Sequence, residues 1–271
     1  MADQNAQAAS NNNSQDGFRY IRWDAGGPFA RLTLNRPSQN VLNMEMMEEI
    51  SQAIEQLHGR DEVRLLVLDS ACPGYFSAGA GAEGYTTAKV FQMMEKFHHI
   101  FKTMLRVAKP VLAVVNGVAS AGGCELAAFA DIVIATEKAR FVQPEIKLGV
   151  FPPLGAVVYP RMMGPKRAME LLLTGEALDA KRATEFGLVN RVVPEKDLAA
   201  AVKNLVDRIS NQSGPVLSLA KRVIFEGTWL PFGEALKKSQ DIYLHELYKL
   251  EDAQEGLRAL IEKRKPVWKN K

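Results

Sequence analysis

The feature that most constrains the fold is the alternation of short apolar runs with segments of helical periodicity through the first half of the chain. Strand-like runs are expected at residues 18–23, 29–34, 64–68, 111–115 and 132–135, and helices at 44–57 and 86–105. Strand–helix–strand units repeated in this way build a parallel sheet covered by helices. The chain is therefore predicted to be an α/β protein.

The second half of the chain is predicted to be mainly helical. Apart from a strand-like run at 188–193, helices are expected at 166–173, 180–186, 196–209, 215–226, 232–250 and 252–263. We therefore predict a core over 18–200 and a helical C-terminal region over 201–271. Residues 1–17, rich in Asn, Gln, Ala and Ser, are predicted to be a disordered N-terminal tail without the features of an export signal.

Composition narrows the function classes. With 271 residues, 47% of them hydrophobic, the chain can bury a large core without a disulfide or a structural metal. Its 34 Lys and Arg are interspersed with 31 Asp and Glu, which argues against a nucleic-acid-binding face. Cys72 and Cys124 lack metal-ligand spacing, and no apolar run is long enough to span a membrane. We expect a cytoplasmic protein with no metal, no nucleic-acid partner and no membrane contact.

A glycine-rich segment over 76–84 contains a formal G-x-G-x-x-G at Gly79, Gly81 and Gly84. The context argues against a dinucleotide site, because the last clear strand ends near Leu68, about ten residues too early, and no acidic residue lies at the expected distance. Two interpretations stay open. The segment is either a flexible surface loop or a place where small residues let a backbone N–H approach a ligand oxygen closely.

A second segment, over 115–126, follows directly on a buried strand. A glycine turn and an apolar helical start at Leu126 point unpaired backbone N–H groups toward whatever lies in front of them, which stabilises anions. Ser120 does not fit a serine-hydrolase motif, because Val118 stands where that motif needs glycine. The four histidines all lie on helical segments without a catalytic partner pattern.

Two glutamates lie in apolar surroundings, Glu125 at the start of the expected helix and Glu145 in a third segment over 141–150. Burial raises the pKa of a carboxyl group toward the range useful for proton transfer. The alternative is that both are structural carboxylates that cap a helix or form an ion pair.

Together the three segments resemble the crotonase superfamily, the enoyl-CoA hydratases and isomerases. Further matches run in the same order from residue 18 onward; they are 40–43, Lys109-Pro110, 173–176, 183–189, Val193-Pro194, 251–256 and 262–268. The resemblance implies a spiral of ββα units. It also implies a helical C-terminal region that forms homotrimers, often paired as hexamers.

The resemblance further implies that two backbone N–H groups, of Ala80 and Gly122, hold the thioester oxygen of an acyl-CoA substrate. Residues expected to border the substrate are Ala78, Gly79, Gly81, Ala82, Tyr85, Gly123, Phe151 and Pro153. Coenzyme A would be carried by the substrate, with no separate cofactor. Its adenine and phosphates would lie near loop 80–85 and basic C-terminal residues such as Lys263, from the same chain or from a neighbouring subunit.

Both acidic positions of the hydratase pattern are present, as Glu125 and Glu145, whereas isomerases of this kind commonly lack one. The resemblance thus implies addition of water to an activated double bond. Two departures border the acyl pocket: Phe151-Pro152-Pro153 replaces the usual glycine-rich stretch, and Gly81 replaces an acid. The Val-Phe-Pro-Pro variant is most similar to hydratases of cyclohexa-1,5-diene-1-carbonyl-CoA in anaerobic degradation of aromatic acids.

Several alternatives remain at this point. A generic enoyl-CoA hydratase, an isomerase or a ring hydrolase would use the same scaffold. A non-catalytic or RNA-binding relative would need a basic helix, for which only Lys237-Lys238 is a candidate. A nicotinamide-dependent enzyme would need the glycine motif to bind a dinucleotide.

Overall fold

The computed structural model describes residues 17–81, 84 and 86–271, so the predicted tail lies outside the described residues apart from Gly17. The strands are β1 (Ile21–Asp24), β2 (Ala30–Leu34), β3 (Val41–Leu42), β4 (Leu66–Ser70), β5 (Gly74–Ser77), β6 (Gly79–Ala80), β7 (Val111–Val115), β8 (Gly117–Ser120), β9 (Ile132–Thr136), β10 (Arg140–Val142), β11 (Leu178–Asp179) and β12 (Arg191–Val193).

The α-helices are α1 (Met44–Glu55), α2 (Val90–Val107), α3 (Gly122–Ala128), α4 (Pro153–Met163), α5 (Pro165–Thr174), α6 (Ala180–Phe186), α7 (Leu198–Ser210), α8 (Gly214–Gly227), α9 (Phe232–His245) and α10 (Glu251–Ile261). Short 3₁₀ helices with bounds inside the described residues are η2 (Pro144–Leu148), η3 (Glu195–Asp197) and η4 (Leu247–Lys249).

Two sheets carry the fold. The larger has the order β1-β2-β4-β7-β9-β12, in which β1 is antiparallel to β2 and every other neighbouring pair is parallel. The smaller has the order β11-β10-β8-β5, and β3 pairs with β6 separately. The chain passes from a strand of the large sheet to a strand of the small sheet and then to a helix, as in β4-β5-α2 and β7-β8-α3. This succession is the spiral of ββα units that the resemblance implies.

The small sheet determines where the candidate site lies. Strands β5, β8 and β10 are parallel, and their ends come level where Ser77 pairs with Ala119 and Ala119 with Phe141. Parallel strands end at the same edge of a sheet, so the segments that follow them meet there. These are the three segments in which the sequence places its candidate functional residues.

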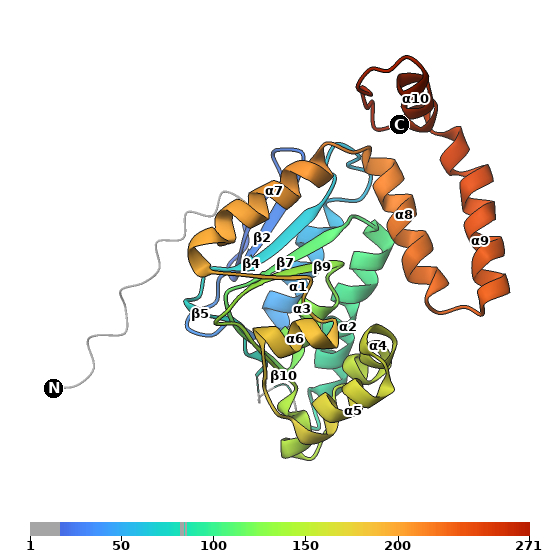
Figure 1. Ribbon diagram of the computed structural model, residues 1–271. Helices are drawn as coiled ribbons and strands as arrows, with labels where there is room; N and C mark the ends of the chain where they lie inside the picture. The colour runs from blue at the N-terminus through green and yellow to red at the C-terminus, as the bar shows by residue number, and fades with distance from the viewer. Residues whose placement is uncertain (1–16, 82–83, 85) are drawn as a thin grey trace.

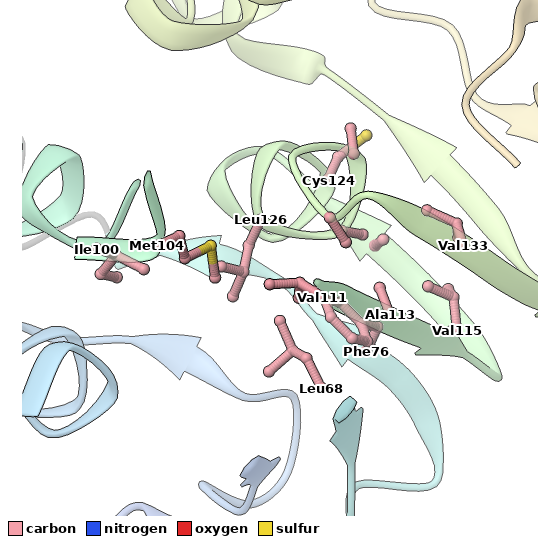
Figure 2. Close-up of a cluster of buried hydrophobic side chains, with 14 of the residues drawn as sticks. Leu68, Phe76, Ile100, Met104, Val111, Ala113, Val115, Cys124, Leu126 and Val133 are labelled. Carbon is pink, nitrogen blue, oxygen red and sulfur yellow. The ribbon is translucent and has the colours of Figure 1, made fainter. Parts of the chain in front are cut away.

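The main core fills the space between the strands and helices α1, α2 and α3. Figure 2 shows Leu68, Val111 and Ala113 of the large sheet near Phe76 of β5, with Leu126 of α3 near Met104 of α2. The opposite face of the large sheet is covered by α7 (Figure 1), whose contacts are Val202 and Val206. Because both faces are buried at the centre of the sheet, β4, β7 and β9 contain continuous apolar runs, whereas β1 and β2 alternate between buried and more exposed residues.

Asn40 ties the segment before α1 to β5. It is fully buried with a φ of 49°, accepts a hydrogen bond from the Arg36 N–H over 2.7 Å, and donates to Ser70 Oγ at 2.8 Å and the Phe76 carbonyl at 2.9 Å. Asparagine tolerates the left-handed conformation better than most residues. These bonds hold β3 beside β6, the strand that contains Ala80.

The last three helices form an arm that extends away from the sheets (Figure 1). Lys221 of α8 fastens the base of this arm, with Nζ 2.7 Å from Asp131 Oδ2 and 2.9 Å from the Lys109 carbonyl. Apolar side chains exposed on the arm include Ile224, Phe232, Leu260 and Ile261. The boundary expected between residues 200 and 201 falls within α7 and stays a prediction.

The structure corrects several sequence expectations. The helix expected over 232–250 ends at His245, and Leu250 is extended before α10 begins. Strands β5, β8 and β10 and helix α4 were not predicted, and α4 begins after Pro152 and contains Pro160. In the described part of the chain, no helix is both long and apolar enough to cross a membrane.

Candidate active site

Two loops meet at the end of the small sheet, one after β5 and one after β8. A Cβ atom placed on Gly79 would lie 2.7 Å from Ala121 Cβ and 2.8 Å from the Gly122 nitrogen. Gly79 has a φ of 81° and Ala121 a φ of 50°. Only glycine fits at position 79, since an L-residue would combine strain with a backbone clash. This contact places the Ala80 and Gly122 segments side by side.

Gly122 is the first residue of α3, and its N–H is one of the helix donors that no intrahelical carbonyl can accept. Tight packing fixes its position: a Cβ on Gly122 would lie 2.9 Å from Phe97 Cζ, and one on Gly123 would lie 2.4 Å from the Ser77 carbonyl oxygen. Gly79 and Gly123 therefore form the packed support of the loops that carry Ala80 and Gly122, while Ala78 is half-buried and donates its N–H to the Gln39 carbonyl over 2.9 Å.

Glu125 lies in the first turn of α3 and is 4% exposed. Its Oε1 accepts a hydrogen bond from the Gly155 N–H of α4 over 2.6 Å. Burial raises the pKa of Glu125 to about 8, the hydrogen bond from Gly155 opposes this, and the nearby Glu145 raises the pKa further. Glu125 is therefore a carboxyl group that can hold or release a proton near neutral pH.

Glu145 is the second carboxyl group of the site. It lies in η2, which follows β10 along the chain, and is also 4% exposed. Burial raises its pKa above the usual glutamate range. Among residues 17–81, 84 and 86–271, neither Glu125 nor Glu145 forms an ion pair, so the ion-pair interpretation of these two residues is wrong.

A buried polar chain continues from Glu145 into the protein. The amide of Gln143, fully buried, lies 2.5 Å from the Tyr159 hydroxyl, and that hydroxyl lies 3.6 Å from Cys124 Sγ. Burial raises the pKa of Cys124 to about 12, so its thiol is neutral. Gln143, Tyr159 and Gly155 were missed by sequence reasoning because α4 was not predicted in a segment with three prolines.

The other predicted site residues are placed unevenly. Gly81 lines a hollow of about 230 Å³ beside α2, while Ala82 and Tyr85 lie outside the described residues. Pro153 is the first residue of α4, and Phe151, just before it, is 67% exposed. Lys263 follows α10 on the arm, away from α4 and α5 (Figure 1), so a single chain does not bring it to the site.

The hollow beside Gly81 contains two cations that the sequence analysis did not single out, Arg36 and Lys89, which lie among its lining residues with Glu45. Arg36 also donates to the Val41 carbonyl over 2.9 Å. The signal available in the sequence was only the proximity of Arg36 to the 40–43 motif. A basic hollow that includes Gly81, the residue after Ala80, is suited to a phosphate.

The geometry of the glycine motif at Gly79, Gly81 and Gly84 does not fit a dinucleotide-binding turn. One argument against it was wrong, because β5 ends at Ser77, directly before the motif. However, Gly79 and Ala80 continue into β6, and α2 begins only at Val90, so the first two glycines do not open a helix as a dinucleotide-binding turn requires. In the described part of the chain, no three His, Cys, Asp or Glu side chains are placed to hold a metal ion.

Comparison with known proteins agrees with this geometry. A family model described as enoyl-CoA hydratase/isomerase matches residues 25–271. A probable mitochondrial enoyl-CoA hydratase of Dictyostelium discoideum is 35% identical over 90% of this chain and 89% of its own length. The cyclohexa-1,5-dienecarbonyl-CoA hydratase of Thauera aromatica is 32% identical over 90% of this chain and 94% of its own length.

Solved structures show the same fold. The crystal structure of an enoyl-CoA hydratase from Bacillus anthracis has a TM-score of 0.87 and 29% identity, covering 93% of this chain and all of that one. The crotonase fold expected from the sequence is thereby confirmed. With the family model matching almost the whole described chain, the protein belongs to the enoyl-CoA hydratase/isomerase family.

Proposed function

We propose that this protein adds water to the double bond of an α,β-unsaturated acyl-CoA thioester. The observation that carries the proposal is the pair of buried carboxyl groups, Glu125 and Glu145, beside the two loops of Ala80 and Gly122. Burial raises the pKa of both carboxyl groups, and Glu145 raises that of Glu125 further. Members with a single acid at this place are suited to moving a proton, whereas two acids are suited to adding water.

The thioester oxygen is proposed to accept hydrogen bonds from the Ala80 and Gly122 N–H groups. As water attacks the β-carbon, electrons move through the double bond onto this oxygen, and donors aimed at it stabilise the developing charge. Loss of one such donor costs about 10²–10³ in rate in enzymes of this general type. The hollow near Gly81, with Arg36 and Lys89, is proposed to receive part of the coenzyme A, with Lys263 supplied by a neighbouring subunit.

The two glutamates are proposed to share one proton at neutral pH, since two nearby buried carboxyl groups do not ionise independently. The ionised one takes a proton from water as its oxygen bonds to the β-carbon. The protonated one gives its proton to the carbon end of the enolate, or to the far end of a dienolate. The product contains one added water, and the pair again holds one proton.

For the acyl group, we propose the ring substrate cyclohexa-1,5-diene-1-carbonyl-CoA. Support comes from Phe151-Pro152-Pro153, which ends two residues before the Gly155 that donates to Glu125, and from the similarity to the Thauera aromatica enzyme, whose name gives this activity. A generic enoyl-CoA hydratase is the second candidate. It is favoured by the equally extensive similarity to the Dictyostelium discoideum protein.

The test is mass spectrometry of the purified protein incubated with cyclohexa-1,5-diene-1-carbonyl-CoA and, separately, with crotonyl-CoA. Rapid gain of one water on the diene with little on crotonyl-CoA supports the ring substrate, and the reverse supports the generic hydratase. Rearrangement without water gain would support an isomerase, and ring opening a hydrolase. No change in either substrate contradicts the proposal and favours a non-catalytic relative.

Catalytic variants sharpen the same experiment. Glu125→Gln and Glu145→Gln keep the size of the side chain and remove its acid–base function. Each is expected to lower the rate of water addition by at least about 10²-fold. Glu176→Gln, which removes an exposed carboxylate paired with Lys147 in the same region, is the matched control and is expected to keep full activity. Near-normal turnover in either catalytic variant would show that the two-glutamate mechanism is wrong.

A further inference from the structure

Helix α4 contacts both carboxyl groups of the site, one directly and one through another residue. Gly155 donates to Glu125, and one helical turn later Tyr159 places its hydroxyl 2.5 Å from the amide of Gln143. A Cβ on Gly155 would lie 3.0 Å from Tyr159 Cε2, so the glycine leaves room for the ring. Tyr159 is 1% exposed, which fixes the ring among its neighbours.

The orientation of the Gln143 amide follows from what faces it. The amide atom nearer Glu145 lies 3.0 Å from both Oε1 and Oε2 of that carboxyl group. An amide oxygen there would face two acceptors of an ionised carboxylate, whereas Nε2 donates to both. With Nε2 toward Glu145, the amide oxygen faces Tyr159 and accepts its O–H over 2.5 Å. This is the arrangement in which every polar group is satisfied.

Tyr159 is able to act as this donor. Burial raises its pKa well above the ordinary tyrosine value, so the hydroxyl keeps its proton. Its other neighbour is Cys124 Sγ at 3.6 Å, and sulfur is a weaker acceptor than an amide oxygen. The proton of the hydroxyl is therefore directed to Gln143 when Glu145 is ionised.

We propose that Tyr159 is a positioning residue for the acid–base group Glu145, because its hydroxyl holds the Gln143 amide with Nε2 facing that carboxyl group. The inference rests on the proposed function. Whether Glu145 gives or takes a proton, it is ionised either before or after that step. The Gln143 amide donor therefore stabilises the carboxylate form of Glu145, which each turnover must pass through. Without the hydroxyl, the amide loses the partner that fixes its orientation.

The other titratable and charged groups around Glu145 do not provide another source of stabilisation for its carboxylate form. Glu125 and Cys124 face it from α3, and Tyr159 from α4. On its own segment, Lys147 is paired with Glu176 over 2.8 Å. Helix α5 also packs against η2; its Arg167 lies over the Phe186 ring, its Glu170 pairs with Arg182 over 3.1 Å, and its remaining charged residue is Lys166.

The test is a double-mutant cycle of Tyr159→Phe and Gln143→Met, read by carboxyl ¹³C NMR. The Glu145 resonance is assigned by its loss in Glu145→Gln, and its titration midpoint is followed with pH. Tyr159→Phe removes one hydroxyl and is expected to raise the midpoint, to lower kcat about tenfold and to change KM less than about twofold. In the Gln143→Met background, Tyr159→Phe is expected to have no further effect on the midpoint.

An unchanged midpoint in Tyr159→Phe overturns the inference, as does an equal shift in the Gln143→Met background, which would show that Tyr159 does not act through Gln143. Tyr248→Phe, the same change on a half-exposed tyrosine of the arm, is the control and should match wild type. If Tyr159→Phe does not fold, Gln143→Met alone must raise the midpoint. Because NMR does not need turnover, an inactive wild-type protein would contradict only the proposed hydratase function.

Discussion

The backbone N–H of Gly155 donates to Oε1 of Glu125 over 2.6 Å, joining the first turn of α4 to the first turn of α3. This bond favours the ionised carboxylate, but burial outweighs it, and the pKa of Glu125 rises to about 8. The protein therefore keeps a buried acid whose ionisation at higher pH costs stability.

The first prediction concerns that cost. Between the ordinary pKa of 4.5 and about 8, folded Glu125 holds a proton that the unfolded chain has released, so this residue's contribution to stability falls as pH rises. Glu125→Gln lacks this dependence. Its free energy of unfolding relative to wild type should increase by on the order of 3–5 kcal/mol from pH 4 to pH 9. Urea denaturation at several pH values measures it.

Glu255→Gln is the control for this experiment. Arg264 holds the pKa of Glu255 down at about 2, and the unfolded chain releases this proton near 4.5, so above about pH 6 Glu255 is ionised in both states and its stability difference should stay flat there. A flat difference for Glu125→Gln as well would show that Glu125 titrates like an ordinary glutamate.

The second prediction concerns the contact between the two loops. In Gly79→Ala, the new methyl group would be 2.7 Å from Ala121 Cβ and 2.7 Å from the Ser120 carbonyl, so the Ala80 and Gly122 donors must move apart. We expect kcat/KM to fall by about 10²-fold or more. Gly74→Ala is matched, since Gly74 has a similar φ of 74° but open space around it. Equal losses in both variants would mean that strain alone, and not loop geometry, explains the effect.

The third prediction addresses the acyl pocket. Phe151→Ala should lower kcat/KM for cyclohexa-1,5-diene-1-carbonyl-CoA by about tenfold or more while changing that for crotonyl-CoA little, since a ring gains more than a short chain from an aromatic contact. Leu148→Ala, at a similarly exposed side chain on η2, is the control. Parallel losses for both thioesters would remove Phe151 from any role in substrate choice.

The fourth prediction concerns assembly. Leu260 and Ile261 are 75% and 81% exposed at the end of α10, two residues before Lys263. If the arm packs against neighbouring subunits, a Leu260→Glu, Ile261→Glu double variant should shift the protein from trimer to monomer in light scattering. The monomeric variant should still unfold cooperatively on heating, because the substituted side chains are exposed within one chain. A matched Lys265→Glu variant on the same exposed end should remain assembled. A wild-type monomer would contradict the proposed trimer.

Much of the fold could be predicted because the large sheet is buried on both faces. Runs such as residues 111–115 are apolar throughout and consist of β-branched and aliphatic residues, so they can be recognised as buried strands from the sequence alone. The small sheet was missed because β10 has three residues and β5 contains Gly74, and such strands are stable only when their neighbours are in place.

The site was predicted unevenly for a related reason. Glu125 and Glu145 stand in apolar sequence, and their burial could be expected from it. The roles of Gly155, Gln143 and Tyr159 depend on α4, a helix that follows one proline, begins with a second and contains a third. Local propensity disfavours a helix there, and packing against α5 together with the hydrogen bonds of Gly155 and Tyr159 decides otherwise.

The level ends of β5, β8 and β10 have an evolutionary consequence. Each ββα unit brings one segment of the proposed site to the same edge: the first unit brings Ala80, the second brings Gly122 and Glu125, and the third brings Glu145. If these segments act as proposed, a substitution within one unit changes how protons move while the other units still bind the thioester. An ancestral chain with this fold could therefore change its chemistry through substitutions in one ββα unit at a time while it kept the same mode of substrate binding.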